Sequence, residues 1–262
     1  MKRLKIISLY SGSTGNSTLV SSGDSTILID AGKSARSLCA AVRAAGYDID
    51  NIDAIFITHE HTDHISALEV LEKKHNIPVH MTEQSAARVR LCPTSQLASR
   101  IVRHQPHFSV ELCGMRVSSF CTSHDSAMSV GYRIELESGG ESCLFGLATD
   151  TGYVTDEMKC GLLGCDAVLI ESNHDVDMLR TGPYPAELKR RILSRSGHLS
   201  NEDCAAFAAE LAKNGTKRFM LGHLSEENNT PDAALCTVLS ALSGFEGISV
   251  CAACADCETV MI

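Results

Sequence analysis

Residues 56–68 of the chain read FITHEHTDHISAL, and this stretch decides both the fold and the expected site. The apolar residues ahead of it predict a β-strand over 53–57, and the pattern behind it predicts a helix over 64–75. Four side chains of the kinds that bind metal ions fall within six positions at the turn between them. They are His59, His61, Asp63 and His64.

Their spacing divides these four side chains into two pairs. His59 and His61 lie two positions apart in extended backbone, so both project to the same side and can reach one metal ion. Asp63 and His64 stand at the start of the expected helix and turn toward a different point. A lone histidine is more often a packed or surface residue, but four ligand-type groups in one strand-to-helix turn indicate a metal site.

Two metal ions need more ligands than this turn supplies, and three other strand ends offer them. His124 in FCTSHDS, Asp150 in LFGLATDTG and His223 in RFMLGHLS each follow an apolar run. Alone, each residue is more simply interpreted as a capping or hydrogen-bonded polar residue at a strand end. Together they complete a set of seven ligands for two divalent metal ions.

Composition limits the class of protein. The chain has 262 residues, of which 44% are hydrophobic, so it can bury a sizeable core, and we expect a single domain over 1–262. The net charge of −9 argues against a surface that binds nucleic acid everywhere but allows a local basic patch. No apolar stretch is long enough to span a membrane and no signal peptide is evident, so we expect no membrane contact and a cytoplasmic protein.

Hydrophobic patterning predicts alternating strands and helices. Strands are expected at 4–10, 17–22, 25–30, 53–57, 115–120, 129–137, 142–148, 166–171, 217–221 and 247–254. Helices are expected at 33–45, 64–75, 82–90, 184–194, 201–213 and 231–242. Hairpins in the first part and alternation in the second indicate two packed mixed sheets with helices on their outer faces.

The order of the seven ligands along the chain resembles that of the metallo-β-lactamase-fold hydrolases. The stretch LIDAG, with Asp30, also matches that superfamily. The resemblance implies an α/β protein, a four-layer αββα sandwich of two mixed β-sheets flanked by helices, with a two-metal site along one edge of the β layers. It also implies how the ligands divide: His59, His61 and His124 for one metal, Asp63, His64 and His223 for the other, and Asp150 between both.

Three further stretches resemble one subgroup of this superfamily, the WalJ (YycJ) group of bacterial proteins. They are SLYSGSTGNSTLV near the start, LIESNHDVDMLRTGPYP in the middle, and SGHLSNED followed by LGHLSEENN. This resemblance implies a metal-dependent DNA exonuclease with a link to DNA repair.

The ligand types indicate the chemistry. Two divalent ions lower the pKa of a shared water, so the expected reaction is hydrolysis by a metal-bridging hydroxide. Two such ions with Asp63, Asp150 and the hydroxide leave a net charge of about +1, which a monoanionic phosphodiester balances. Because no ligand is a thiolate, both Zn²⁺ and Mn²⁺ fit the site, and the sequence does not choose between them.

Asp63 and His198 are the expected catalytic residues. His198 in RSGHLSNED precedes a helix start, and a histidine with no catalytic role is as reasonable on the motif alone. The segment resembles the histidine motif of nucleases in the superfamily, which implies that His198 contacts the scissile phosphate or protonates the leaving oxygen. A general acid is worth about 10²- to 10⁴-fold in rate for such a poor leaving group.

The stretch LRTGPYPAELKRRILSRSGH carries a local excess of positive charge just before His198. Most such runs are solvated helix faces. The position beside a catalytic histidine favours contact with the phosphate backbone of DNA. The expected substrate-binding residues are Arg180, Arg190, Arg191 and Arg195.

Three further features were interpreted more simply. Asp30 and His174 are expected to form hydrogen bonds to metal ligands without binding the metal themselves. The SGSTGNS loop lacks the lysine and spacing of a nucleotide-binding loop, so we expect a tight hairpin. Cys251, Cys254 and Cys257 fall in an expected strand, where residues three apart point to opposite faces, so we expect an incidental cysteine-rich strand with reduced thiols.

Two other functions stay open. The same dinuclear site could hydrolyse small phosphodiesters, thioesters or lactones, and activity on an aryl phosphodiester with none on DNA would favour this alternative. A non-catalytic binding module would bind no metal and hydrolyse nothing. The sequence does not fix DNA against RNA, strand polarity, oligomeric state or protein partners.

Overall fold

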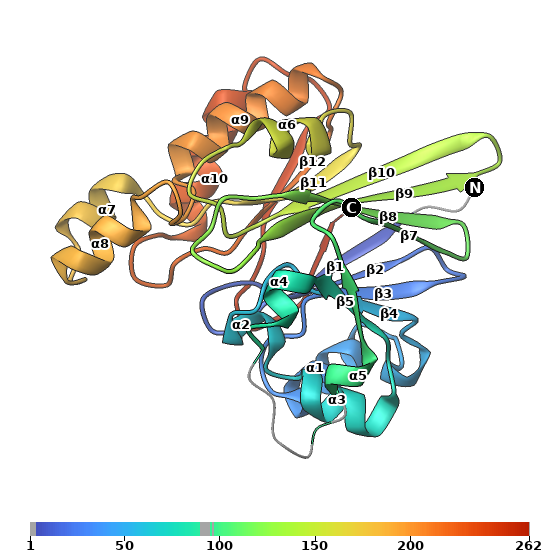
Figure 1. Ribbon diagram of the computed structural model, residues 1–262. Helices are drawn as coiled ribbons and strands as arrows, with labels where there is room; N and C mark the ends of the chain where they lie inside the picture. Colours follow the sequence, from blue (N-terminus) through green and yellow to red (C-terminus); the bar gives the residue numbers. More distant parts are fainter. Residues whose placement is uncertain (1–3, 90–94, 96, 262) are drawn as a thin grey trace.

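The computed structural model describes residues 4–89, 95 and 97–261, and it shows two β-sheets packed face to face with helices on both outer sides (Figure 1). The predicted four-layer αββα sandwich is confirmed. Among the described residues, no helix is both long and apolar enough to cross a membrane.

The first sheet comes mainly from the N-terminal part of the chain. In bonding order its strands are β14 (Thr259–Met261), β1 (Lys5–Tyr10), β2 (Ser17–Ser21), β3 (Thr26–Ile29), β4 (Ala54–Phe56), β5 (Val79–Thr82) and β6 (Ile101–His104). The strands from β14 to β3 are antiparallel neighbours, whereas those from β3 to β6 run parallel.

The second sheet comes from the later part of the chain. In bonding order its strands are β13 (Ser249–Ala252), β12 (Arg218–Gly222), β11 (Ala167–Glu171), β10 (Glu141–Ala148), β9 (Val130–Ser138), β8 (Met115–Cys121) and β7 (Ser109–Leu112). β10 to β13 are parallel, and β7 to β10 are antiparallel.

Helices lie outside both sheets (Figure 1). On the side of the first sheet are α1 (Ala35–Ala44), α2 (Thr62–Ile65), α3 (Leu68–His75), α4 (Glu83–Ala86), α5 (Leu97–Arg100) and a short 3₁₀ turn, η1 (Ile49–Asn51). On the side of the second sheet are α6 (Asp156–Leu162), α9 (Asn201–Lys213) and α10 (Pro231–Leu242). Two short helices, α7 (Val176–Thr181) and α8 (Ala186–Ile192), stand out at one end of the sandwich.

Apolar side chains fill the three spaces between the four layers. Neighbouring strand residues contribute to different spaces, because successive side chains point to opposite faces. On β2, for example, Leu19 packs toward the helices while Val20 packs between the sheets. All five residues of β2 are buried, as expected for a strand with both faces covered.

Most predicted elements are confirmed, and the differences involve short ones. β5, β6, β7 and β14 were not predicted, because each has only three or four residues and most carry polar side chains. The predicted helix over 64–75 is divided into α2 and α3, and residue 90 of the helix predicted over 82–90 lies outside the described residues. The short helices α5, α6 and α7 were also missed.

The predicted helices 201–213 and 231–242 are present as α9 and α10, and each begins at a residue suited to a helix start. The Ser200 hydroxyl accepts a hydrogen bond from the backbone N–H of Asp203 at 3.1 Å. Pro231 stands at the first position of α10, where its missing N–H costs nothing.

Four stacked rings join the two sheets near β5 and β6. The centroid of the His80 ring lies 4.7 Å from that of Phe56 and 5.2 Å from that of His104, and His104 stacks on Phe108 at 4.0 Å. Nδ1 of His80 and Nε2 of His104 are 2.9 Å apart. Burial, together with the neighbouring His104 ring, lowers the pKa of His80 to about 4.

This shift predicts that His80 makes the protein sensitive to acid. The unfolded chain binds a proton on His80 at its ordinary pKa of 6.5, whereas the folded protein binds it only near pH 4. Between these values the unfolded state holds more protons, so the free energy of unfolding falls as the pH is lowered. Urea unfolding of the wild type and of His80→Phe at about pH 7 and about pH 5 should show a smaller fall for the variant. Equal falls in both proteins would contradict this.

Candidate metal centre

The seven predicted ligands meet at one edge of the sandwich, where strands of both sheets end. These strand ends are far apart in the sequence, so the side chains meet only in the folded protein. One group follows β4, and single residues follow β8, β10 and β12. The group is His59, His61, Asp63 and His64, and the single residues are His124, Asp150 and His223.

Three residues at these strand ends have left-handed backbone. The φ angle is +63° at Asp30, +55° at Asp150 and +55° at His223. Non-glycine residues in such regions cost of order 1 kcal/mol or more, and they persist where surrounding contacts fix the backbone. Here the N–H of Asp30 donates to the Phe56 carbonyl and that of His223 to the Ser11 hydroxyl, both at 2.8 Å. The edge that carries the ligands is therefore rigid and strained.

The first ligand group consists of three imidazoles. His59, His61 and His124 each offer a ring nitrogen, and these nitrogens lie within 4.8 Å of one another. Nε2 of His59 and Nδ1 of His61 are 3.0 Å apart. Nδ1 of His124 donates to the Gly197 carbonyl at 3.1 Å, which leaves its Nε2 free to bind.

The second group is Asp63, His64 and His223, and Asp150 lies between the two groups. Oδ2 of Asp63 is 3.2 Å from Nε2 of His64 and 3.8 Å from Nε2 of His223. Oδ2 of Asp150 is 3.4 Å from Nε2 of His64, and its Oδ1 is 3.4 Å from Nε2 of His223. Oδ1 of Asp150 is also 3.9 Å from Nε2 of His124, which belongs to the first group.

Oδ2 of Asp150 and Nε2 of His223 are buried in this centre, and neither has a hydrogen-bond partner among the residues that the structure describes. Leaving a buried polar atom unpaired costs roughly 1–3 kcal/mol. Imidazole nitrogens and carboxylate oxygens at this spacing are a suitable ligand set for divalent cations. The residues present therefore fit the metal ions that the sequence predicts.

Asp30 and Thr58 hold the two histidines that follow β4, His59 and His64, on the side away from the centre. Asp30 Oδ2 accepts from Nδ1 of His64 at 2.8 Å, and its Oδ1 accepts from the Thr58 N–H at 2.8 Å. The Thr58 hydroxyl donates to Asp30 and lies 3.0 Å from Nδ1 of His59. Both histidines are therefore held through Nδ1, so Nε2 points to the centre. Asp30 thus lies where the sequence analysis expected it.

Glu171, at the end of β11, was not predicted. It is fully buried, and its Oε1 accepts from Nδ1 of His198 at 2.7 Å and from Nδ1 of His223 at 3.1 Å. Its Oε2 accepts the backbone N–H groups of Thr151 at 2.9 Å and Leu199 at 3.3 Å. The signal was available, since Glu171 follows an apolar strand just as Asp150 does.

Charged groups in the centre shift one another's pKa values. Burial by itself raises the pKa of the Asp63 carboxyl, but hydrogen bonds from His223 and His64 outweigh it and hold the pKa well below its usual value. Burial lowers the pKa of His64, but Asp30 and Asp150 outweigh that effect and raise it. The Asp63 carboxylate therefore stays ionised, and the site favours positive charge.

A pocket of about 270 Å³ opens over this centre. His198 lies in it beside the predicted ligands, and Tyr184, Leu188 and Ile192 form an apolar side. The His198 ring stacks on that of His223 with centroids 5.2 Å apart. Because Nδ1 of His198 is bonded to Glu171, its Nε2 is the nitrogen left for a substrate.

Only one of the four predicted arginines lines this pocket. Arg191 does so, and its guanidinium pairs with Asp125. The guanidinium of Arg195 lies 4.0 Å above the Tyr153 ring instead. Arg180 and Arg190 are exposed and do not line the pocket. Of the local basic patch expected from the sequence, only Arg191 therefore lies at the pocket.

His174 does not lie where the sequence analysis expected it. Its ring is buried, and neither ring nitrogen has a hydrogen-bond partner among the described residues, so it holds no metal ligand through a hydrogen bond. The neighbouring Asn173 has the expected kind of contact, because its Nδ2 donates to the His223 carbonyl at 2.9 Å.

The loop between β1 and β2 also reaches the centre. Asn16 Nδ2 lies 3.1 Å from both Oδ2 of Asp63 and Nε2 of His64, and Ser13 lines the pocket. The loop was predicted only as a hairpin. This contact was not predicted, because it joins residues 47 and 48 positions apart.

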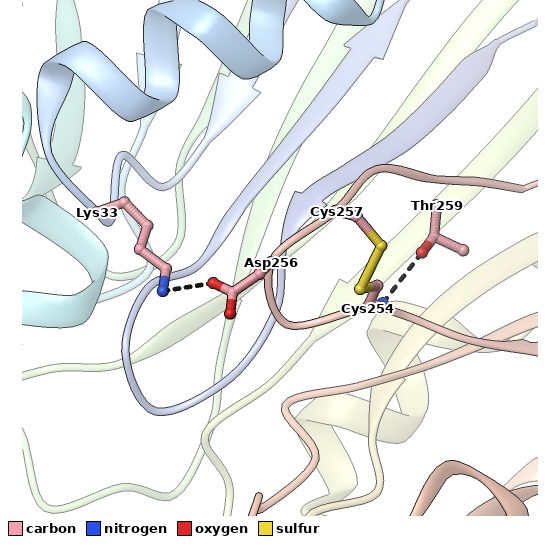
Figure 2. Close-up of a disulfide and its surroundings, with 5 residues drawn as sticks. All are labelled: Lys33, Cys254, Asp256, Cys257 and Thr259. Atoms are coloured by element: carbon pink, nitrogen blue, oxygen red, sulfur yellow. Dashed lines mark hydrogen bonds and ion pairs between the residues drawn. A yellow bond between two sulfur atoms is a disulfide. The ribbon is translucent and has the colours of Figure 1, made fainter.

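The C-terminal cysteines differ from their expected arrangement. Cys254 and Cys257 form a disulfide in the loop between β13 and β14, so they are not in a strand and not reduced (Figure 2). In the same loop Asp256 pairs with Lys33 at 2.8 Å, as Figure 2 shows. Cys251 stands in β13 and is free.

Comparison with known proteins shows the family to which the chain belongs. The Beta-lactamase superfamily domain matches residues 25–224. The exodeoxyribonuclease YycJ of Bacillus anthracis is 39% identical over 238 residues, which cover 89% of this chain and 87% of the relative. The exodeoxyribonuclease WalJ of Streptococcus pneumoniae is 36% identical over 240 residues, which cover 90% of this chain and 87% of the relative.

Solved structures show the same fold at low sequence identity. The metallo-β-lactamase-fold protein YhfI from Bacillus subtilis superposes with a TM-score of 0.69 at 18% identity, over 99% of this chain and 100% of that one. Zn²⁺-bound PqqB from Methylobacterium extorquens gives a TM-score of 0.67 at 18% identity, over 97% and 99%. The chain belongs to the metallo-β-lactamase superfamily and, within it, to the group of the WalJ and YycJ proteins.

Proposed function

We propose that the protein is a metal-dependent exodeoxyribonuclease, which hydrolyses phosphodiester bonds at the ends of DNA. The observation that carries this proposal is the combination of a seven-ligand centre with His198, a histidine beside the ligands that Glu171 holds in place. The names of the relatives at 36–39% identity support DNA as the substrate.

Two divalent ions, Zn²⁺ or Mn²⁺, are part of this proposal. His59, His61 and His124 would hold one, Asp63, His64 and His223 the other, and Asp150 both. When bound, such a pair activates a water for attack and stabilises charge that develops on phosphate oxygens. Asp63 and Asp150 offset only part of the charge of two divalent ions, so an anionic phosphodiester suits the centre.

His198 is proposed as the general acid. Its Nδ1 donates to Glu171, which fixes the ring so that Nε2 faces the pocket. From there Nε2 can give a proton to the sugar oxygen that leaves, and a positioned acid contributes about 10²- to 10⁴-fold. Glu171 acts through His198 and His223 and does not need to touch the substrate.

The cellular setting is part of the same proposal. We place the protein in the cytoplasm, where bacterial DNA lies, and in DNA repair, a process that needs DNA ends to be trimmed. Both statements rest on the resemblance to the WalJ (YycJ) group.

A second candidate is a hydrolase of small phosphodiesters. A pocket of about 270 Å³ can enclose little more than one small ligand, which is the observation that favours it. The pocket is open, however, so a DNA end can also enter it with the rest of the strand outside.

The first test is the product pattern on DNA. Linear duplex and single-stranded DNA, labelled at one end and incubated with Mn²⁺ or Zn²⁺, should be shortened progressively from an end. Asp63→Ala should lose both activity and bound metal, because a ligand is removed, and His198→Ala should lose activity by about 10²-fold or more while keeping its metal. Hydrolysis of an aryl phosphodiester with intact DNA would favour the second candidate.

A second prediction concerns Glu171→Gln. An amide cannot accept two imidazole N–H groups and two backbone N–H groups as the carboxylate does, so both histidines lose support. Turnover and metal affinity should each fall by about 10- to 100-fold. Atomic absorption of the dialysed variant distinguishes it from His198→Ala, which keeps its metal. An unchanged metal affinity would show that Glu171 does not support His223.

A third prediction compares two adjacent arginines of α8. Arg191 lines the pocket, whereas Arg190 is exposed and does not, so Arg190→Ala is the matched control. If Arg191 contacts one phosphate, Arg191→Ala should lower the slope of log affinity against log salt by about 0.7 to 0.9. Fluorescence anisotropy of labelled DNA measures this slope. A slope that changes equally in both variants would show a diffuse basic surface.

A further inference from the structure

Three side chains of metal-ligand type also meet outside the seven-ligand centre. His107 lies in the connection between β6 and β7, Cys121 is the last residue of β8, and Glu157 stands in the first turn of α6. One ligand atom from each lies within 4.8 Å of the others. This cluster, called here the His107–Cys121–Glu157 cluster, combines an imidazole, a thiol and a carboxylate.

The distances between its ligand atoms are close to those between atoms that bind the same zinc ion. Cys121 Sγ is 3.9 Å from Nε2 of His107, and that nitrogen is 3.6 Å from Oε2 of Glu157. Tetrahedral zinc bonds of about 2.0 to 2.3 Å place such ligand atoms about 3.3 to 3.6 Å apart. A contraction of a few tenths of an ångström would therefore complete the site.

The backbone around the His107–Cys121–Glu157 cluster is fixed before any ion binds. On either side of His107, the Ser119 hydroxyl donates to the Pro106 carbonyl at 2.8 Å and accepts the Phe108 N–H at 2.9 Å. The connection is therefore tied to β8, only two residues from Cys121. A preorganised arrangement lowers the entropy that binding must overcome.

The helix that carries Glu157 is fixed to the same strand. Gly161 of α6 packs so closely on the Phe120 ring, next to Cys121, that no Cβ would fit between them. In addition, the Cys121 N–H donates to Oε2 of Glu157 at 3.2 Å. All three ligands thus come from segments whose relative positions are already set.

We propose that His107, Cys121 and Glu157 form a separate binding site for a divalent cation of the zinc class, with water in the remaining position. A thiolate and a carboxylate balance the two charges of the ion, and the imidazole adds a neutral ligand. Without an ion, burial and the hydrogen-bonded Glu157 raise the pKa of the Cys121 thiol to about 11. A cation at this position reverses that effect, since a coordinated thiol is deprotonated.

An ion in this site would act on the active centre from a distance. His124 follows Cys121 by three residues, and β8 ends between them. Binding would join the end of β8 to α6 and to the β6–β7 connection, which restricts the backbone that positions His124. The site does not depend on the proposed nuclease function.

Cobalt titration tests the proposal, because the His107–Cys121–Glu157 cluster contains a thiolate ligand and the seven-ligand centre contains none. A thiolate bound to Co²⁺ gives a strong charge-transfer absorption in the near ultraviolet, whereas the seven-ligand centre offers only nitrogen and oxygen. When the metal-free protein is titrated with Co²⁺ without added thiols, this absorption should saturate at the amplitude of one thiolate-bound ion per chain, besides the ions that the seven-ligand centre takes up. Cys121→Ser should abolish it, and His107→Ala should weaken it by about tenfold or more in apparent affinity.

Two controls exclude other thiols. Cys160→Ser removes an exposed thiol on the same helix α6 and should leave the absorption unchanged. The double variant Cys254→Ser with Cys257→Ser excludes the C-terminal pair. The proposal is overturned if the wild type shows no thiolate absorption, if Cys121→Ser retains it, or if the C-terminal double variant loses it. DNA hydrolysis is not measured, so failure here leaves the nuclease proposal intact.

Discussion

Ring nitrogens and carboxylate oxygens can face one another across a small buried volume only if the other polar atoms of the same side chains are hydrogen-bonded elsewhere in the protein. Asp30 holds His64, Thr58 stands against His59, and Glu171 holds both His198 and His223. Each bond also selects the nitrogen that faces the centre. The candidate chemistry therefore depends as much on Asp30 and Glu171 as on the ligands themselves.

The sandwich supplies these supports because strands of both sheets end along one edge. Asp30 directly follows β3, and Glu171 ends β11, so each sheet contributes one of these two supporting carboxylates. Left-handed backbone at Asp30, Asp150 and His223 turns the chain sharply at that edge. The surrounding core of three apolar layers resists relaxation of this strain.

The parts of the fold and of the candidate site that depend on neighbouring residues were predictable from the sequence. The 56–68 stretch indicated four side chains of the candidate centre, and apolar strand ends indicated the three that the fold brings beside them. Contacts across long separations were not predictable: Asn16 reaches Asp63 only because a hairpin folds over the β4–α2 turn. The charge run before His198 could not show which arginine faces the pocket, since that depends on how α8 packs. Short strands such as β5 are defined by pairing with their neighbours, which composition does not reveal.

The loop of Cys254 and Cys257 has a consequence for how the protein is made. Its Asp256 pairs with Lys33, which in turn donates to Thr14 in the loop that reaches Asp63 and His64. β14 also pairs with β1. During synthesis the edge of the N-terminal sheet therefore stays incomplete until the segment that carries β14 has left the ribosome. A nascent chain that already contains all seven candidate ligands still lacks this support until the segment that carries β14 has been made.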